Sequence, residues 1–307
     1  MIPPKSLNFN DPRVVLKDYP HWETSFPQKG ESKVYVGEQV PLGYLYLASP
    51  FWIPEGTSKW YTDGQLVKVR MRRDGYAYFD NPIERTFHAN GILYQVPVEV
   101  GRTYTGSGVF ASTFAAEGVL RDWVVPDGWT GPKALDLQAC TRMTIEDVAI
   151  GRPQDPGSYG LGLQYATNIT VRSLKTRGVR HPIIPWCIAR SGFWNVRHEE
   201  PAHDFDFGHG FCEDLIYADC NLGDRNGAVG NRWSAPCRNL TITGAKNARD
   251  LLVYSGSVVN VNQSRFNLLR LNQNLPGKGM RVDCDWESFT GHQREGLTDA
   301  SAEVFLR

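Results

Sequence analysis

The second half of the chain repeats a short pattern of hydrophobic and polar positions. Seven segments between residues 140 and 282 have the form small–x–x–apolar–x–apolar: CTRMTI, ATNITV, SGFWNV, CEDLIY, CRNLTI, GSVVNV and GKGMRV. Successive segments begin about 23 residues apart. An apolar residue at every second position is typical of a β-strand that buries one face. The pattern therefore predicts one such strand in each repeat.

A strand of this length cannot bury its apolar face alone, whereas stacked repeats share one continuous core. The small residue of each segment marks the point where a coil bends inward, at Cys140, Ala166, Ser191, Cys212, Cys237, Gly256 and Gly277. The apolar pairs that should face the core are Met143/Ile145, Ile169/Val171, Trp194/Val196, Leu215/Tyr217, Leu240/Ile242, Val259/Val261 and Met280/Val282. Asx residues suit turns, and we expect a short ladder of them after the bend at Asn168, Asp214 and Asn239.

A second strand precedes the bend in most repeats. Its inward positions are Leu135/Leu137, Leu161/Leu163, Trp186/Ile188 and Leu251/Val253. Together the two strands predict an all-β fold, a parallel β-helix of about seven coils over residues 126–290. A two-sheet β-sandwich also has short strands and is the alternative fold.

The first half of the chain is also rich in strand patterns but lacks the repeat. The segment VKVRMRRDGYAYF alternates around Asp74-Gly75 and predicts a β-hairpin. We interpret residues 31–125 as a small β domain that ends in a cap over the exposed strand edge of the solenoid. Residues 1–30 are expected to form an extended arm, and residues 291–307 a C-terminal cap or tail.

The coil pattern, over roughly residues 130–290, resembles the right-handed parallel β-helix of the pectate-lyase-like superfamily. With a β domain and an arm in front of it, the chain resembles bacteriophage tailspike and tail fibre proteins. The resemblance implies that the N-terminal region attaches to other tail proteins of the virion. It also implies that the β-helix binds, and often cleaves, a bacterial surface polysaccharide, and that the assembly is a homotrimer.

Composition and charge exclude several function classes. Lys and Arg number 33, as do Asp and Glu, and a neutral chain of this kind argues against nucleic acid as the partner. The N-terminal residues lack the basic and apolar regions of a signal peptide, and no apolar run approaches the length of a membrane span. The six cysteines form no CxxC pair, so we expect free, buried thiols. We expect no cofactor and no metal.

The stretch EEPAHDFDFGHGFCED, residues 199–214, concentrates the candidate chemistry. Aligning Cys212 with Ala166 turns Phe205, Phe207 and His209 toward the core. Asp204 and Asp206 then point outward, with Cα atoms about 6.5–7 Å apart. This spacing suits the carboxyl pair of glycoside hydrolysis, which lies roughly 5–9.5 Å apart. The candidate catalytic residues are Asp204, Asp206 and Glu200.

The candidate binding residues lie around this stretch: Glu199, His203, Arg172, Arg197 and Trp186. Arg172 and Arg197 are expected as neighbours in one outward column, with Glu146 beside Arg172. The triplet GHG at residues 208–210 resembles the Gly-His-Gly element of polygalacturonase-type hydrolases. In that family the paired Asp lies about one coil earlier, whereas here Asp204 and Asp206 share the strand of His209. The alternative interpretation of the whole stretch is a solvated strand face.

Three functions remain open. The first is a virion tail spike or fibre that recognises, and in an enzymatic form cleaves, a bacterial surface polysaccharide. The second is a structural fibre or baseplate component without activity, favoured by a helix of only about 34 Å at 4.8 Å for each coil. The third is a free polysaccharide lyase or glycoside hydrolase, which the lack of an export signal disfavours.

Overall fold

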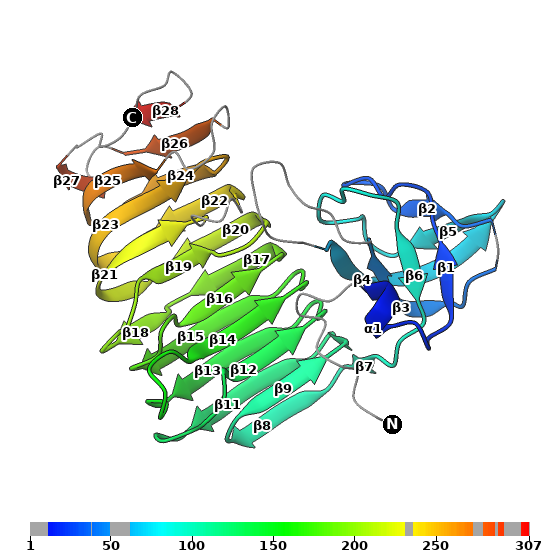
Figure 1. Cartoon of the computed structure of the whole chain (residues 1–307), viewed down its shortest axis with the longest axis horizontal. Coiled ribbons are helices and arrows are strands. Elements are labelled where there is room, and N and C mark those ends of the chain that lie inside the picture. Colours follow the sequence, from blue (N-terminus) through cyan, green and yellow to red (C-terminus); the bar gives the residue numbers. More distant parts are fainter. Residues whose placement is uncertain are drawn as a thin grey trace.

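The computed structural model describes residues 12–37, 39–49, 62–230, 236–272, 279–285, 288–291 and 302–306. It has two parts, an antiparallel sheet near the N-terminus and a parallel β-solenoid of about seven turns (Figure 1). The short helix α1 (Pro12–Val15) lies beside the N-terminal sheet (Figure 1). In the described part of the chain, no helix has the length and apolar composition needed to cross a bilayer.

The N-terminal sheet has six strands in the order β1-β6-β3-β4-β5-β2, and each described pairing is antiparallel. The strands are β1 (His21–Glu23), β2 (Lys33–Tyr35), β3 (Gly43–Ala48), β4 (Gly64–Arg73), β5 (Tyr76–Phe79) and β6 (Ile92–Tyr94). The hairpin predicted around Asp74-Gly75 is confirmed, because Arg73 pairs with Tyr76. Asp74 and Gly75 have φ values of 52° and 77°, as the two central positions of a type I′ turn require.

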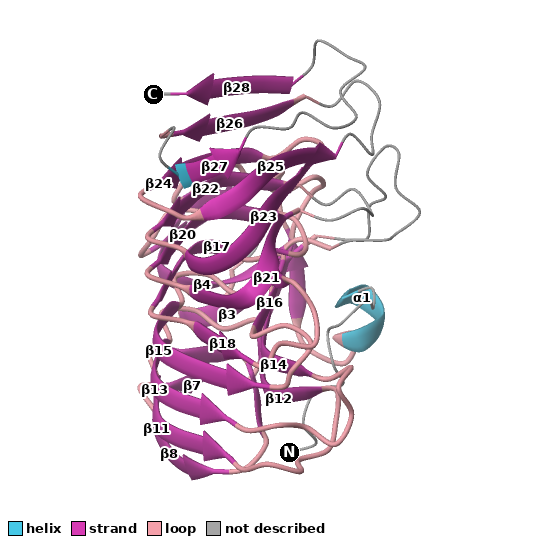
Figure 2. Cartoon of the chain, turned by 90° about the vertical axis from the view of Figure 1, so that its left-hand side faces the viewer, coloured by secondary structure: helices cyan, strands magenta, loops and turns pink. Residues whose placement is uncertain are grey.

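The solenoid stacks parallel strands on three faces (Figure 2). The front face consists of β8 (Thr103–Ser107), β11 (Val119–Val125), β13 (Thr144–Ile150), β15 (Thr170–Arg177), β17 (Ala189–Trp194), β20 (Cys212–Ala218), β22 (Cys237–Thr243), β24 (Val258–Asn262), β26 (Met280–Cys284) and β28 (Ala302–Leu306). The second face consists of β9 (Phe110–Thr113), β12 (Lys133–Gln138), β14 (Tyr159–Gln164) and β16 (Ile183–Trp186). The third face consists of β18 (Arg197–Glu199), β21 (Asn221–Val229), β23 (Lys246–Tyr254), β25 (Phe266–Asn272) and β27 (Phe289–Gly291), and β19 (Phe205–Gly208) pairs with β21. The two-residue strands β7 (Glu99–Val100) and β10 (Ala115–Ala116) pair with each other.

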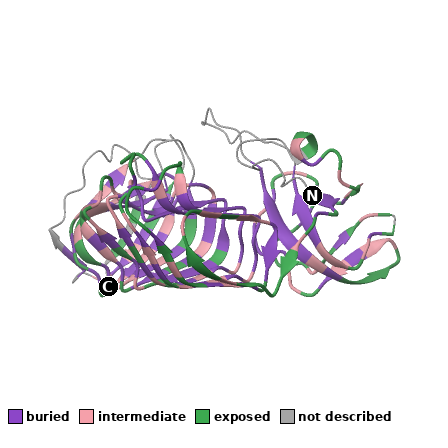
Figure 3. Ribbon diagram, turned by 90° about the horizontal axis from the view of Figure 1, so that it is seen from below, coloured by how far each residue is buried: buried purple, intermediate pink, exposed green. Residues whose placement is uncertain are grey.

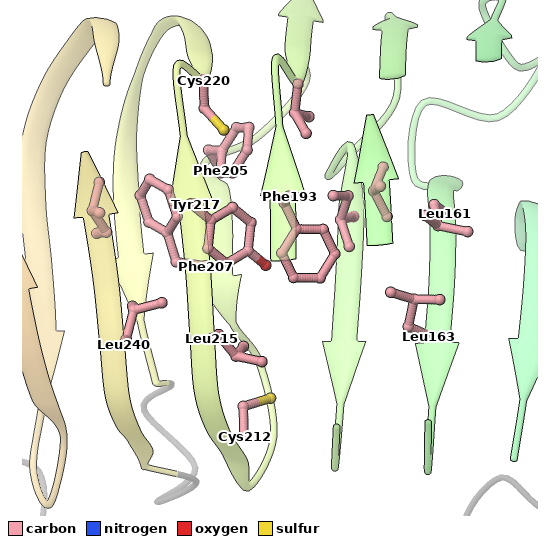
Figure 4. Close-up of a cluster of buried hydrophobic side chains, with 14 of the residues drawn as sticks. Leu161, Leu163, Phe193, Phe205, Phe207, Cys212, Leu215, Tyr217, Cys220 and Leu240 are labelled. Atoms are coloured by element: carbon pink, nitrogen blue, oxygen red, sulfur yellow. The ribbon is translucent and has the colours of Figure 1, made fainter. Parts of the chain in front are cut away.

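One continuous cluster of buried apolar side chains fills the solenoid (Figure 4). The predicted column of small residues is confirmed where Cys140 and Ala166 stack, because Thr141 pairs with Thr167, and where Cys212 pairs with Cys237. All six cysteines are free and buried, as expected. In the core they act as small apolar side chains.

The predicted register is wrong in the third repeat. Ser191 pairs with Leu215, and Phe193 pairs with Tyr217, so Phe193 faces the core and Trp194 faces outward. The small-residue position falls to Ile188 instead of Ser191, because Ala189 pairs with both Thr167 and Glu213. The sequence pattern selected Trp194 because it lies three residues after Ser191, and the ladder of hydrogen bonds shows that Phe193 faces the core instead.

The last repeat is offset by two residues. Val259 pairs with Val282, and Val261 pairs with Cys284, whereas the sequence pattern equated Val259 with Met280. The predicted small residue of this repeat, Gly277, lies outside the described residues. The offset of two residues in the last repeat preserves inward and outward parity because a strand has a period of two, whereas the offset of three residues in the third repeat reverses it.

The predicted Asx ladder is confirmed as one corner of the solenoid. Asn168, Asp214 and Asn239 all have left-handed backbone conformations, with φ between 53° and 55°. Asx residues tolerate this region because their short polar side chains bond nearby backbone. The same corner continues through residues of other types with positive φ: Glu117, Arg142 and Arg190. We call this set the corner column.

The N-terminal sheet packs against the solenoid through a second hydrophobic cluster. Tyr46 and Tyr94 from the sheet contact a cluster that includes Phe114, Tyr165 and Trp186 from the solenoid. Buried residues therefore continue from one part into the other (Figure 3). Trp186, which the sequence pattern turned into the solenoid core, lies in this interface instead, because Leu163 pairs with Pro185 and places Trp186 beside Gln164 on the outer side.

Candidate functional site

Strand β19 places Asp206 on the outer side of the solenoid but not in open solvent. Phe205 and Phe207 are fully buried in the core, so the predicted alternation is confirmed for these residues. Asp206 points away from them, yet it is only 5% exposed. The expectation of an exposed carboxylate is therefore wrong, because side chains from the preceding coil and from the end of β19 cover Asp206.

His209 is one of the covering side chains, and its predicted inward orientation is wrong. Its Nδ1 lies 2.7 Å from Asp206 Oδ2, and its side chain is 20% exposed. Strand β19 ends at Gly208, and the backbone N–H groups of His209 and Gly210 both donate to the Pro185 carbonyl. This turn breaks the alternation on which the inward prediction depended.

His181 covers Asp206 from the other side. Its Nε2 lies 3.6 Å from Asp206 Oδ2, and its Nδ1 lies 2.5 Å from the carbonyl oxygen of Asp204. Tyr159 stacks on the imidazole of His181 with ring centroids 5.6 Å apart, and His203 meets it edge-on at 5.0 Å. We call Asp206, His181, His203, His209 and Tyr159 the Asp206 cluster.

Within the Asp206 cluster, Asp206 and His181 each change the pKa of the other. Burial by itself would raise the pKa of Asp206, but the imidazoles of His181 and His209 lower it below its usual value. Burial lowers the pKa of His181, and the charge of Asp206 offsets this only in part. An ionised Asp206 thus accepts a hydrogen bond from His209 and fixes the orientation of its ring. A carboxylate that orients an imidazole in this way prepares it for proton transfer.

The other predicted catalytic residues, Asp204 and Glu200, lie outside strand β19. Asp204 precedes β19, is half-buried, and meets His181 through its backbone carbonyl. Glu200 is exposed, has a φ of 47°, and forms an ion pair with Arg152. Glu199 lies 3.0 Å from the Nζ of Lys175. Exposed ion pairs of this kind add little stability.

The predicted binding residues lie in separate places. Arg172 and Arg197 are both exposed, but they are not neighbours in one column. Arg172 pairs in register with Glu146, as predicted, and on its other side with Trp194, whereas Arg197 pairs with Lys175. His203 belongs to the Asp206 cluster, and Trp186 is buried in the interface with its ring 5.4 Å from that of His209.

His181 and Tyr159 were missed by the sequence analysis, although the repeat contains a signal for them. His181 precedes Asp206 by 25 residues, and Tyr159 precedes His181 by 22 residues, each close to one coil. In a parallel solenoid, residues one repeat apart stack on neighbouring strands. Reading the stretch together with the two preceding coils would therefore have placed both rings beside Asp206.

Comparison with known proteins adds to this geometry. No family model matches the chain, and no curated protein matches it in sequence. Among solved structures, it is similar to tailspike gp61 of Pseudomonas phage phi297, with a TM-score of 0.62 and 12% identity over 93% of this chain and 59% of that chain. It is also similar to tailspike gp49 of Pseudomonas phage LKA1, with a TM-score of 0.53 and 12% identity over 94% of this chain and 59% of that chain.

The chain thus spans about three-fifths of the length of these two tailspikes. At this level of identity the likeness concerns the backbone arrangement. Because it extends over 93% of the chain, it includes the N-terminal sheet as well as the solenoid. The parallel β-solenoid of about seven turns, together with the antiparallel sheet before it, therefore has a fold similar to that of these two phage tailspikes.

Proposed function

We propose that this chain is a virion tail protein, a spike or fibre, whose solenoid recognises a bacterial surface polysaccharide. The observation that carries the proposal is the likeness to tailspike gp61, which includes both parts of the molecule. In this proposal the N-terminal region contacts other tail proteins, and three copies of the chain assemble side by side. A polysaccharide is the ligand expected of a protein that meets the bacterial surface.

Cleavage of the polysaccharide, in an enzymatic form of this function, belongs to the Asp206 cluster. The cluster combines one carboxylate with three imidazoles, and Asp206 holds His209 at 2.7 Å. Glycoside hydrolysis uses two carboxyl groups on either side of the scissile bond, whereas elimination begins with removal of a carbon-bound proton by a base. The chemistry of the cluster therefore favours a lyase over a hydrolase.

The test uses the purified chain and a panel of capsular and O-antigen polysaccharides. Binding is measured by biolayer interferometry, and cleavage by the ultraviolet absorbance of unsaturated products and by new reducing ends. Wild-type protein should bind at least one member of the panel. Asp206→Asn and His209→Gln should lower any cleavage rate by about a hundredfold or more. Asp224→Asn, which alters an exposed ion pair with Arg249, is the matched control and should leave the rate unchanged.

The same experiments separate the three functions. Binding without cleavage supports a recognition protein that is not an enzyme, and an absence of binding to every polysaccharide contradicts the proposal. Mass spectrometry of purified particles should find the chain in the tail. Cleavage by a chain absent from particles would instead identify a free enzyme. Light scattering should give a trimer, and a clean monomer would refute that part of the proposal.

A further inference from the structure

A groove follows the line where loops of the N-terminal sheet meet the front face of the solenoid. It has two adjoining parts with volumes of about 610 Å³ and 560 Å³. The two parts share five bordering residues, Pro82, Glu84, Asn168, Thr170 and Arg190, and are therefore continuous. We call it the seam groove. None of the residues that border it belongs to the Asp206 cluster.

The floor of the seam groove is one row of outward residues on the front face. Thr144, Thr170, Gly192 and Ile216 pair successively across β13, β15, β17 and β20. Neighbouring strands lie about 4.8 Å apart, so this row is about 14 Å long. A floor of this length suits a short oligosaccharide segment better than a single sugar.

An indole ring lies on this floor. Trp194 covers Gly192 so closely that a Cβ atom at Gly192 would lie 2.0 Å from Trp194 Cη2. Glycine is thus the residue that allows the ring to rest against the backbone of β17. Trp194 is nevertheless 36% exposed, and it borders the groove. An aromatic surface that is open in a groove beside Arg190 and Asp214 offers an apolar platform with hydrogen-bonding groups near it.

One wall of the seam groove is the corner column. Loops of the N-terminal sheet contact the corner column through a hydrogen bond and an ion pair. Asn168 donates the hydrogen bond to Glu84 Oε1, and Lys29 Nζ lies 2.8 Å from Asp214 Oδ2 in the ion pair. Arg190 lies between Asn168 and Asp214 in the corner column. It is exposed and borders both parts of the groove. Over the described residues, its guanidinium makes no hydrogen bond or ion pair.

We propose that the seam groove binds a segment of the polysaccharide, with one pyranose ring stacked on Trp194. Arg190 then holds two neighbouring oxygen atoms of that sugar or of the next one, because its planar fork presents paired donors. The carboxylate of Asp214, which is partly exposed, accepts hydrogen bonds from hydroxyl groups along the wall. The inference rests on the proposed function for its class of ligand, but it assigns binding to a site away from the Asp206 cluster.

The test measures the affinity of variants for a polysaccharide that the wild-type chain binds in the panel described above. Trp194→Ala removes the platform, Gly192→Val displaces the indole by collision, and Arg190→Ala removes the fork. Each should weaken binding by about tenfold or more, equivalent to about 1.4 kcal/mol. Asn260→Ala is the matched control, because Asn260 lies in the same outward row two strands beyond Ile216, and its affinity should not change.

Hydrogen–deuterium exchange gives a second readout that does not depend on a variant. The bound polysaccharide should slow exchange in residues 189–194 and 81–84, which face each other across the groove. The groove is not the binding site if the affinities of Trp194→Ala and Arg190→Ala lie within about twofold of the wild-type affinity, or if protection is confined to residues 203–209. In either case the proposed recognition of a polysaccharide by this chain would still hold. If the wild-type chain binds no polysaccharide at all, the proposed function and this inference fail together.

Discussion

The buried side chain of Arg85 joins the N-terminal sheet to the solenoid, and its removal is the sharpest test of how the two parts are held together. Arg85 is 1% exposed, and its guanidinium lies 3.0 Å from Asp63 Oδ1 and 2.6 Å from the carbonyl oxygen of Cys187 at the solenoid corner. Burial by itself would lower the pKa of Arg85, but the charge of Asp63 raises it above its usual value. Arg85 therefore stays protonated inside this interface.

Arg85→Met should lower the free energy of unfolding by about 3–5 kcal/mol. Removing one partner of a buried ion pair costs this much because the other charge stays buried without its counter-charge. After the change, Asp63 still accepts hydrogen bonds from Ser49 and His88 but loses its guanidinium partner. The Cys187 carbonyl loses its donor. At about 2 °C for each kcal/mol, the melting temperature should fall by roughly 6–10 °C.

The assay is a double-mutant cycle with Asp63→Asn, followed by urea unfolding and calorimetry. The double variant Asp63→Asn/Arg85→Met should lose less stability than the two single changes together, with an interaction energy of about 1–3 kcal/mol. Arg121→Met, which alters an exposed pair with Asp122, is the control and should change stability by less than about 0.5 kcal/mol. A loss below about 1 kcal/mol for Arg85→Met, or strict additivity in the cycle, would refute the reasoning.

Three further predictions test the solenoid. Phe193→Ala should lower the free energy of unfolding by about 3–5 kcal/mol because the ring is fully buried. Trp194→Ala on the outer face should lower it by less than about 1 kcal/mol. If urea unfolding gave the reverse order, the register expected from the sequence would be favoured. Gly208→Val should lower the free energy of unfolding by about 1–3 kcal/mol, because a Cβ there would lie 2.8 Å from Cys237 Sγ. Calorimetry measures the effect, and an unchanged melting temperature would show that the coil shifts to accommodate the side chain. Burial lowers the pKa of His198 to about 4, so the unfolded chain binds a proton that the folded chain does not, and stability should fall as the pH drops from about 6.5 to 4. Relative to His198→Leu, the wild type should lose up to about 3 kcal/mol of unfolding free energy, measured by urea titration, over that range. A difference in unfolding free energy that does not change with pH would contradict the assignment.

The solenoid itself was predictable because its signal is local and repeated. Parity within each strand follows from the alternation of adjacent side chains, so Phe205, Phe207 and Leu215 were turned toward the core correctly. The Asx corner was predictable for the same reason, since Asn168 and Asp214 suit a left-handed turn by their own chemistry. Errors arose where coils differ in length, as at Ser191, because the register then depends on hydrogen bonds to the neighbouring coil.

The candidate site was predictable only in part. Asp206 was identified as an outward carboxylate, but its burial depends on His181 and His209, which reach it from another coil and from a turn. The seam groove was not predictable, because its opposite wall comes from residues around Glu84 that the chain brings back over the solenoid. Sequence periodicity reports how each strand buries its own face, and it carries no information about contacts between distant parts. The amino-acid sequence by itself therefore determined the stacked coils and their core, whereas tertiary packing decided which polar side chains are buried, paired or open to a ligand.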